Sequence, residues 1–206
     1  MEKKKDYLQD IADIRSMMER SSKFLSLSGW AGIMAGIYAL VGAYIAYAFF
    51  KFNPTEVAYS TLETATPSMV GITVLALSIL LLSVGTAIWL SYQRATKRAE
   101  PIWNATSRRL LAGTTTPLVA GGVLALVFIA HGLIGLLAPI TLLFYGLALY
   151  SAGNYTYREV RYLGIILVTF GLLGSFAVEY GLLLWAIGFG LMHIIYGIYI
   201  HIKYER

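Results

Sequence analysis

The sequence contains no cysteine in 206 residues, and only 13% of its residues are charged. The absence of cysteine excludes disulfides, thiolate nucleophiles and cysteine-ligated metals. An ordinary soluble domain is about 25% charged, whereas here 58% of residues are hydrophobic and the mean hydropathy is +0.68. A soluble globule could not cover so much apolar surface, so the composition predicts an integral membrane protein.

Six hydrophobic runs are long enough to cross a bilayer as helices, which requires about 20 apolar residues each. They are residues 24–50, 70–92, 110–130, 133–150, 162–178 and 182–202. The third and fourth runs meet at His131 and Gly132, and their combined length needs two crossings joined by a tight turn. The sequence therefore predicts an all-α polytopic membrane bundle with six transmembrane helices in residues 24–206.

Lysine and arginine are distributed unequally around these runs. Six crossings place fifteen of the sixteen basic residues on one side and Lys51 alone on the other. Basic flanks are retained in the cytoplasm, so both termini are expected there. The same rule explains the net charge of +5, and no nucleic-acid partner is needed to account for it.

Residues 1–23 precede the first run and have a different pattern. Tyr7, Ile11, Ile14 and Met18 are spaced 4-3-4, with acidic and basic residues between them. This spacing predicts an amphipathic helix of about four turns. Two interpretations remain open: the helix lies on membrane lipids with its bases near anionic headgroups, or it binds a cytoplasmic protein partner.

Small residues lie on one face of the first run, at Gly29, Gly32 and Gly36. Such a face lets another helix approach closely. The neighbouring helix belongs either to the same bundle or to a second copy in a homo-oligomer.

Ionisable and polar residues inside the predicted membrane region are the best pointers to a site. His193 lies within the sixth run, with Tyr196 three residues later, and Thr114, Thr115 and Thr116 precede Pro117 in the third run. These five residues form a candidate polar path. The alternative for His193 is a structural hydrogen bond, and the threonines can equally bond to their own helix.

A second candidate is a pair at the outer edge, where His131 lies between the third and fourth runs and Glu179 follows the fifth. If the bundle brings them together, they form a proton-linked or ion-binding pair. The alternative is two separate residues exposed to water at the membrane edge.

Enzymatic, metal and cofactor sites have little support. The three histidines lie at different predicted depths, and no pair is spaced i, i+4 as zinc sites on a helix require. No metal and no cofactor is therefore expected, and the lack of a catalytic constellation predicts a protein that is not an enzyme.

Two segments, residues 110–154 and 161–205, show weak internal similarity. LLFYGLALY (142–150) aligns with HIIYGIYIH (193–201) so that Tyr145-Gly146 matches Tyr196-Gly197. The match predicts a tandem duplicated hairpin.

The opening YLQDIADIRSMMERSSKFLSLSGWAGIMAGIYALVGAY, residues 7–44, resembles the start of uncharacterised bacterial membrane proteins. The six-span layout is also loosely similar to that of HdeD-type inner-membrane proteins. The resemblance implies a bacterial inner-membrane location, but no activity and no functional residue. We therefore expect a non-enzymatic module acting through lipid or protein partners. The alternative is a small transporter or channel with a path near His193.

Overall fold

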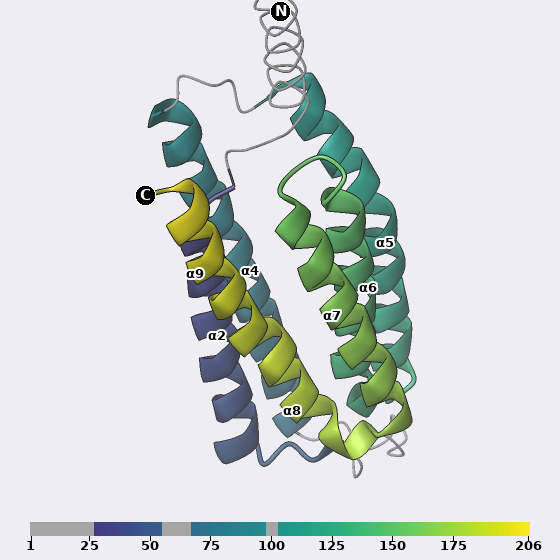
Figure 1. Ribbon diagram of the computed structural model, residues 1–206. Helices are drawn as coiled ribbons and strands as arrows, with labels where there is room; N and C mark the ends of the chain where they lie inside the picture. Colours follow the sequence, from purple (N-terminus) through teal and green to yellow (C-terminus); the bar gives the residue numbers. More distant parts are fainter. Residues whose placement is uncertain (1–26, 55–66, 98–102) are drawn as a thin grey trace, which may run out of the picture.

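The computed structural model describes residues 27–54, 67–97 and 103–206 (Figure 1), and within these ranges the regular structure is entirely helical. The long helices are α2 (Gly29–Ala48), α4 (Pro67–Lys97), α5 (Ala105–Ala130), α6 (Leu137–Ala152) and α7 (Arg158–Phe176). The last span is one run of η3 (Val178–Tyr180), α8 (Gly181–Trp185), the π-helical η4 (Ala186–Met192) and α9 (His193–Tyr204).

Six helical segments are long and apolar enough to cross a membrane, which confirms the predicted fold class. Two of them extend beyond their hydrophobic runs, because α4 continues to Lys97 and α5 begins at Ala105. Asn104 begins α5 with a capping box: its side chain accepts from the Ser107 N–H, and the Ser107 hydroxyl accepts from the Asn104 N–H. The helix predicted for residues 1–23 lies outside the described residues.

The turn predicted at His131–Gly132 is present between α5 and η2 (Ile134–Leu136). Gly132 has a φ of 74°, in the left-handed region where a side chain would be strained. Glycine at this position therefore allows two membrane-length helices to follow each other directly.

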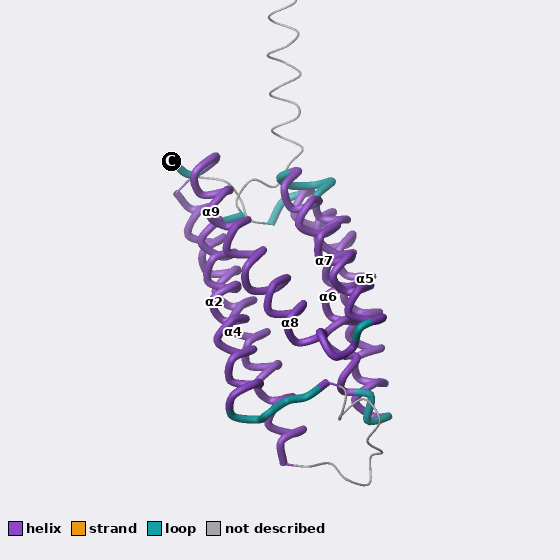
Figure 2. Tube along the Cα trace, turned by 60° about the horizontal axis from the view of Figure 1, so that its bottom comes forward, coloured by secondary structure: helices purple, strands orange, loops and turns teal. Residues whose placement is uncertain are grey.

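The helices form two groups of three. α4 and α9 both pack on α2, whereas α5 and α7 both pack on α6 (Figures 1 and 2). α8 and η4 run between the groups. Their side chains join a cluster around buried Leu142, Leu163 and Leu167. The last span is therefore the element that connects the two halves.

We call one end of the bundle the basic end. There α4, α6 and α9 finish and α2, α5 and α7 begin, and every lysine and arginine of the described ranges except Lys51 lies at or near it. Lys51 follows α2 at the opposite end, where the His131 turn and η3 also lie. Within the described ranges, the fold thus brings together the eight basic residues that the sequence analysis assigned to one side and that the structure describes.

The predicted glycine face of α2 packs against the last span of the same chain. A Cβ atom on Gly36 would lie 2.6 Å from the Gly190 carbonyl oxygen, and one on Gly32 would lie 3.2 Å from that of His193. Gly29 lies against Gly197 and His201. α9 and η4 cover these glycines, so an oligomer built through this face would have to displace them.

The two segments of the predicted repeat are arranged differently. α5 and α6 form a closely packed hairpin, whereas α9 leaves α7 and packs mainly on α2. In agreement with this difference, Gly146 contacts Gly164 of α7, while Gly197 contacts Gly29 of α2. A common origin of the two segments stays a prediction from their sequences.

Candidate functional site

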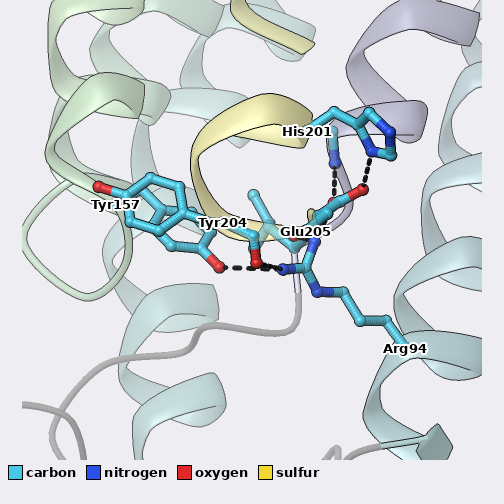
Figure 3. A network of polar contacts seen from close by, with 7 residues as sticks. Arg94, Tyr157, His201, Tyr204 and Glu205 are labelled. Carbon is cyan, nitrogen blue, oxygen red and sulfur yellow. Dashed lines mark hydrogen bonds and ion pairs between the residues drawn. The ribbon is translucent and has the colours of Figure 1, made fainter. Parts of the chain in front are cut away.

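A polar network at the basic end is the most connected site in the described part of the chain (Figure 3). Arg94 of α4 forms an ion pair with Glu205, and each side chain is only 11% exposed. Glu205 also binds His201 Nδ1 at 2.6 Å and accepts the Gly29 backbone N–H at 2.6 Å. One carboxylate therefore connects α4 and α9 to the first residue of α2.

Arg94 extends this network through its remaining N–H groups. Its guanidinium donates to the carbonyl oxygens of Leu27 at 2.9 Å and Tyr204 at 3.2 Å, and to the Tyr157 hydroxyl at 3.4 Å. A guanidinium carries five N–H donors in a fixed plane, which suits it to several acceptors at once. We call Arg94, Tyr157, His201, Tyr204 and Glu205 the basic-end network.

The network also joins the two halves of the bundle. The rings of Tyr157, which precedes α7, and Tyr204 of α9 stack with centroids 4.3 Å apart. Beside them, Glu159 Oε1 of α7 accepts from Lys203 Nζ at 2.7 Å and from the Tyr204 hydroxyl at 3.0 Å. Stacking and hydrogen bonds thus hold α7 against α9 where the two helices meet the basic end.

Sequence analysis did not identify this network. It interpreted Arg94 only as a marker of orientation and did not single out Glu205. One signal was present, because Glu205 follows His201 by four residues and so lies on the same helical face. The partner Arg94 is 111 residues away, and no local pattern indicates that contact.

His193 is buried in the last span, as expected from its position in the sixth run. Its Nδ1 lies 2.9 Å from the Gly188 carbonyl oxygen in the π-helical segment η4. Tyr145 and Phe189 lie against its ring, with centroids 5.7 Å away in both cases. His193 therefore has a hydrogen bond within its own span, whereas the hydroxyl of nearby Tyr196 is buried with no partner.

The three threonines lie in a different setting. The Thr114 hydroxyl donates to the Leu110 carbonyl at 3.1 Å and the Thr115 hydroxyl to that of Leu111 at 2.7 Å. Thr115 and Thr116 are exposed on α5, which packs on α6. Tyr145 of α6 has a ring contact with His193. Sequence analysis did not propose Tyr145 for the path.

His131 and Glu179 both lie at the opposite end and are both exposed. His131 caps α5, and Glu179 is in the single turn η3. Among the ion pairs of the described ranges none joins them. The same ranges contain no cluster of three histidine or acidic residues able to hold a metal ion.

Comparisons with protein-family models, with curated proteins and with solved structures found no match for this chain. The class is therefore defined by the fold alone: an α-helical bundle with six segments suited to crossing a membrane. Its polar groups gather at one end and along the junction between α7 and α9.

Proposed function

We propose that the protein is a non-enzymatic multi-pass module of the bacterial inner membrane that presents residues 1–23 to anionic lipid. In this proposal the basic end faces the cytoplasm, in line with the rule for lysine and arginine. One observation carries the proposal: Arg94 binds the Leu27 carbonyl and Glu205 binds the Gly29 N–H, at the point where the N-terminal segment joins the bundle.

We call these two hydrogen bonds the clamp, because they hold the start of the described chain at a fixed place. Leu27 is four residues beyond the predicted amphipathic helix, so the segment that contains this helix joins the bundle at the basic end. A tethered segment binds a neighbouring surface at a high effective concentration, and the nearest surface is the inner leaflet. The clamp therefore favours a partner in or on the membrane.

The placement of the bases favours lipid among such partners. Residues 1–23 contain six lysines and arginines against five aspartates and glutamates, a net charge of +1, and three of the bases are consecutive at Lys3, Lys4 and Lys5. Each basic residue near an anionic membrane surface contributes about 1 kcal/mol to binding, and the contribution falls with added salt. The apolar residues spaced 4-3-4 would enter the headgroup boundary while these bases contact phosphates.

The absence of cysteine allows a direct test with one labelled position. Met18→Cys, carrying an environment-sensitive fluorophore, is placed in nanodiscs with or without anionic lipid. We expect a blue shift only with anionic lipid, and its loss in high salt and in the Lys3→Gln/Lys4→Gln/Lys5→Gln variant. Arg108→Gln/Arg109→Gln, which removes charge elsewhere at the basic end, is the matched control. Identical spectra in both lipids would contradict lipid as the partner and direct the search to a protein.

A small transporter is the second candidate, and one observation favours it. Tyr196, three residues after His193 in α9, has a buried hydroxyl without a partner. If this region serves transport, proteoliposomes under a pH gradient should show proton flux above that of empty vesicles, and His193→Ala should reduce it. Equal, negligible flux in the wild type and the variant would remove proton transport as a function.

A further inference from the structure

One face of α7 is exposed along the whole helix. Residues three and four apart share a helical face, and on α7 this spacing joins a series that the described part of the chain leaves exposed: Arg158, Arg161, Tyr162, Ile165, Thr169, Leu172, Leu173 and Phe176. The opposite face carries Leu163 and Leu167, which are buried in the bundle. Because α7 is long and apolar enough to span a membrane, its exposed face is the one suited to lipid.

The first two residues of this series are arginines at the basic end. Arg158 and Arg161 are three residues apart, so their Cβ atoms lie about 5–6 Å from each other, within reach of one phosphate group. Neither takes part in an ion pair of the described ranges. The carboxylate nearest in sequence, Glu159, binds Lys203 and Tyr204 of α9 instead. Two like charges one turn apart repel each other, so an anion between them would stabilise this end of α7.

Tyr150 of α6 holds Arg161 in place. The Arg161 guanidinium lies over the Tyr150 ring, 4.6 Å from its centroid, and donates to the Tyr150 hydroxyl at 2.9 Å. Gly153 lets the end of α6 approach α7 here, because a Cβ atom on this residue would lie only 2.6 Å from Arg161 Cβ. The hydrogen bond to Tyr150 uses one of the five N–H donors of the guanidinium, so the others remain for a ligand.

We propose that this arginine pair binds the headgroup of one anionic phospholipid, with the phosphate between Arg158 and Arg161 and the acyl chains along the same face of α7. Arginine suits this role because its planar fork can donate two parallel hydrogen bonds to phosphate oxygens. The order of residues favours a lipid over a soluble anion, since the arginines are followed by the interfacial aromatic Tyr162 and then by apolar Ile165 and Leu172. The site rests on the membrane location proposed above, but it is independent of the role of residues 1–23.

Quenching by brominated lipid tests the site locally. Ile165→Cys, which lies one turn beyond Arg161 on the same face, carries a fluorophore in nanodiscs made of phosphatidylcholine and phosphatidylglycerol in equal parts. Bromine is placed on the acyl chains of one lipid or of the other. We expect stronger quenching when phosphatidylglycerol carries the bromine, because that lipid is held beside α7. Two basic residues near the surface correspond to a preference of up to about 30-fold.

Three variants of the labelled protein separate the site from general charge. Arg158→Gln/Arg161→Gln should remove the preference, so that both brominated lipids quench equally. Tyr150→Leu keeps both charges but removes the contacts that hold Arg161, and it should reduce the preference. Arg108→Gln/Arg109→Gln is the matched control, because it removes the same charge from α5 at the same end. Consecutive residues on a helix do not face each other, so this second pair cannot share a phosphate in the same way, and the preference should stay unchanged.

Four results would overturn the proposal. The first is equal quenching by the two lipids when all four arginines are present, and the second is a preference that Arg108→Gln/Arg109→Gln also removes. The third is a preference that inorganic phosphate abolishes but chloride at the same ionic strength does not, because the ligand would then be a free anion. The fourth, no quenching by either lipid, would also contradict the membrane location. The Met18 probe reports on residues 1–23 separately, so lipid binding there can fail without affecting the result at Ile165.

Discussion

Glu205→Gln is expected to lower the free energy of unfolding by about 3 kcal/mol, the cost of leaving one partner of a buried ion pair without the other. Arg94 would remain 11% exposed, with a positive charge facing a neutral amide. The variant also weakens the bonds to His201 and to the Gly29 N–H. Chemical denaturation in detergent micelles, followed by circular dichroism, measures the loss.

Two further variants separate the ion pair from a general effect of charge. Arg94→Gln/Glu205→Gln should be less destabilising than the two single losses added together, because neither charge is left alone. Glu179→Gln, at an exposed acid of the opposite end, should change stability by less than about 0.5 kcal/mol. If Glu205→Gln behaved like Glu179→Gln, the basic-end network would not hold the bundle together.

Gly197→Ala should destabilise the protein by about 1–3 kcal/mol or more, because the added methyl group meets backbone and not a flexible side chain. The new Cβ would lie 2.5 Å from the Gly29 carbonyl oxygen and 2.6 Å from the Ile33 nitrogen. Backbone atoms cannot rotate away, so α2 and α9 must move apart along their shared face. Thermal unfolding in detergent gives the size of the effect.

Gly85→Ala is the matched control for this substitution. Gly85 lies in α4, and a Cβ added there would meet nothing within 4 Å. Alanine is favoured over glycine in a helix by up to about 1 kcal/mol, so this variant should be neutral or slightly stabilising. Equal destabilisation by both alanines would show that the loss of stability does not come from the α2–α9 contact.

The membrane-spanning helices could be predicted from sequence because their length is set by an external dimension, the thickness of the bilayer. Their ends could not, since Arg94 and Lys97 are helical but polar, and the cap at Asn104 lies outside the hydrophobic run. Hydropathy identifies the part of a helix that lipid covers. Hydropathy does not predict the helical turns that continue into the headgroup region.

Which helices pack against each other was even harder to predict from the sequence. The spacing of Gly29, Gly32 and Gly36 predicted a face for close packing, but it did not identify the last span as the neighbour. The Arg94–Glu205 pair depends on where α4 and α9 both end, which is a property of the whole fold. A duplicated hairpin would have suggested that the last span stays beside α7, whereas it packs mainly on α2.

The contact between α2 and the last span has a consequence for biosynthesis. The ribosome delivers residues 29–48 to the membrane long before residues 178–204. The glycines of α2 therefore lack their native neighbour, the last span, while four more helices are inserted. During that interval lipid or another protein must cover the glycine face that the last span covers in the folded chain. Arg94 can bind the Leu27 carbonyl as soon as α4 is in place, but the Gly29 N–H cannot reach its acceptor until Glu205 has been translated. The first span therefore completes its native contacts only when the last span has arrived.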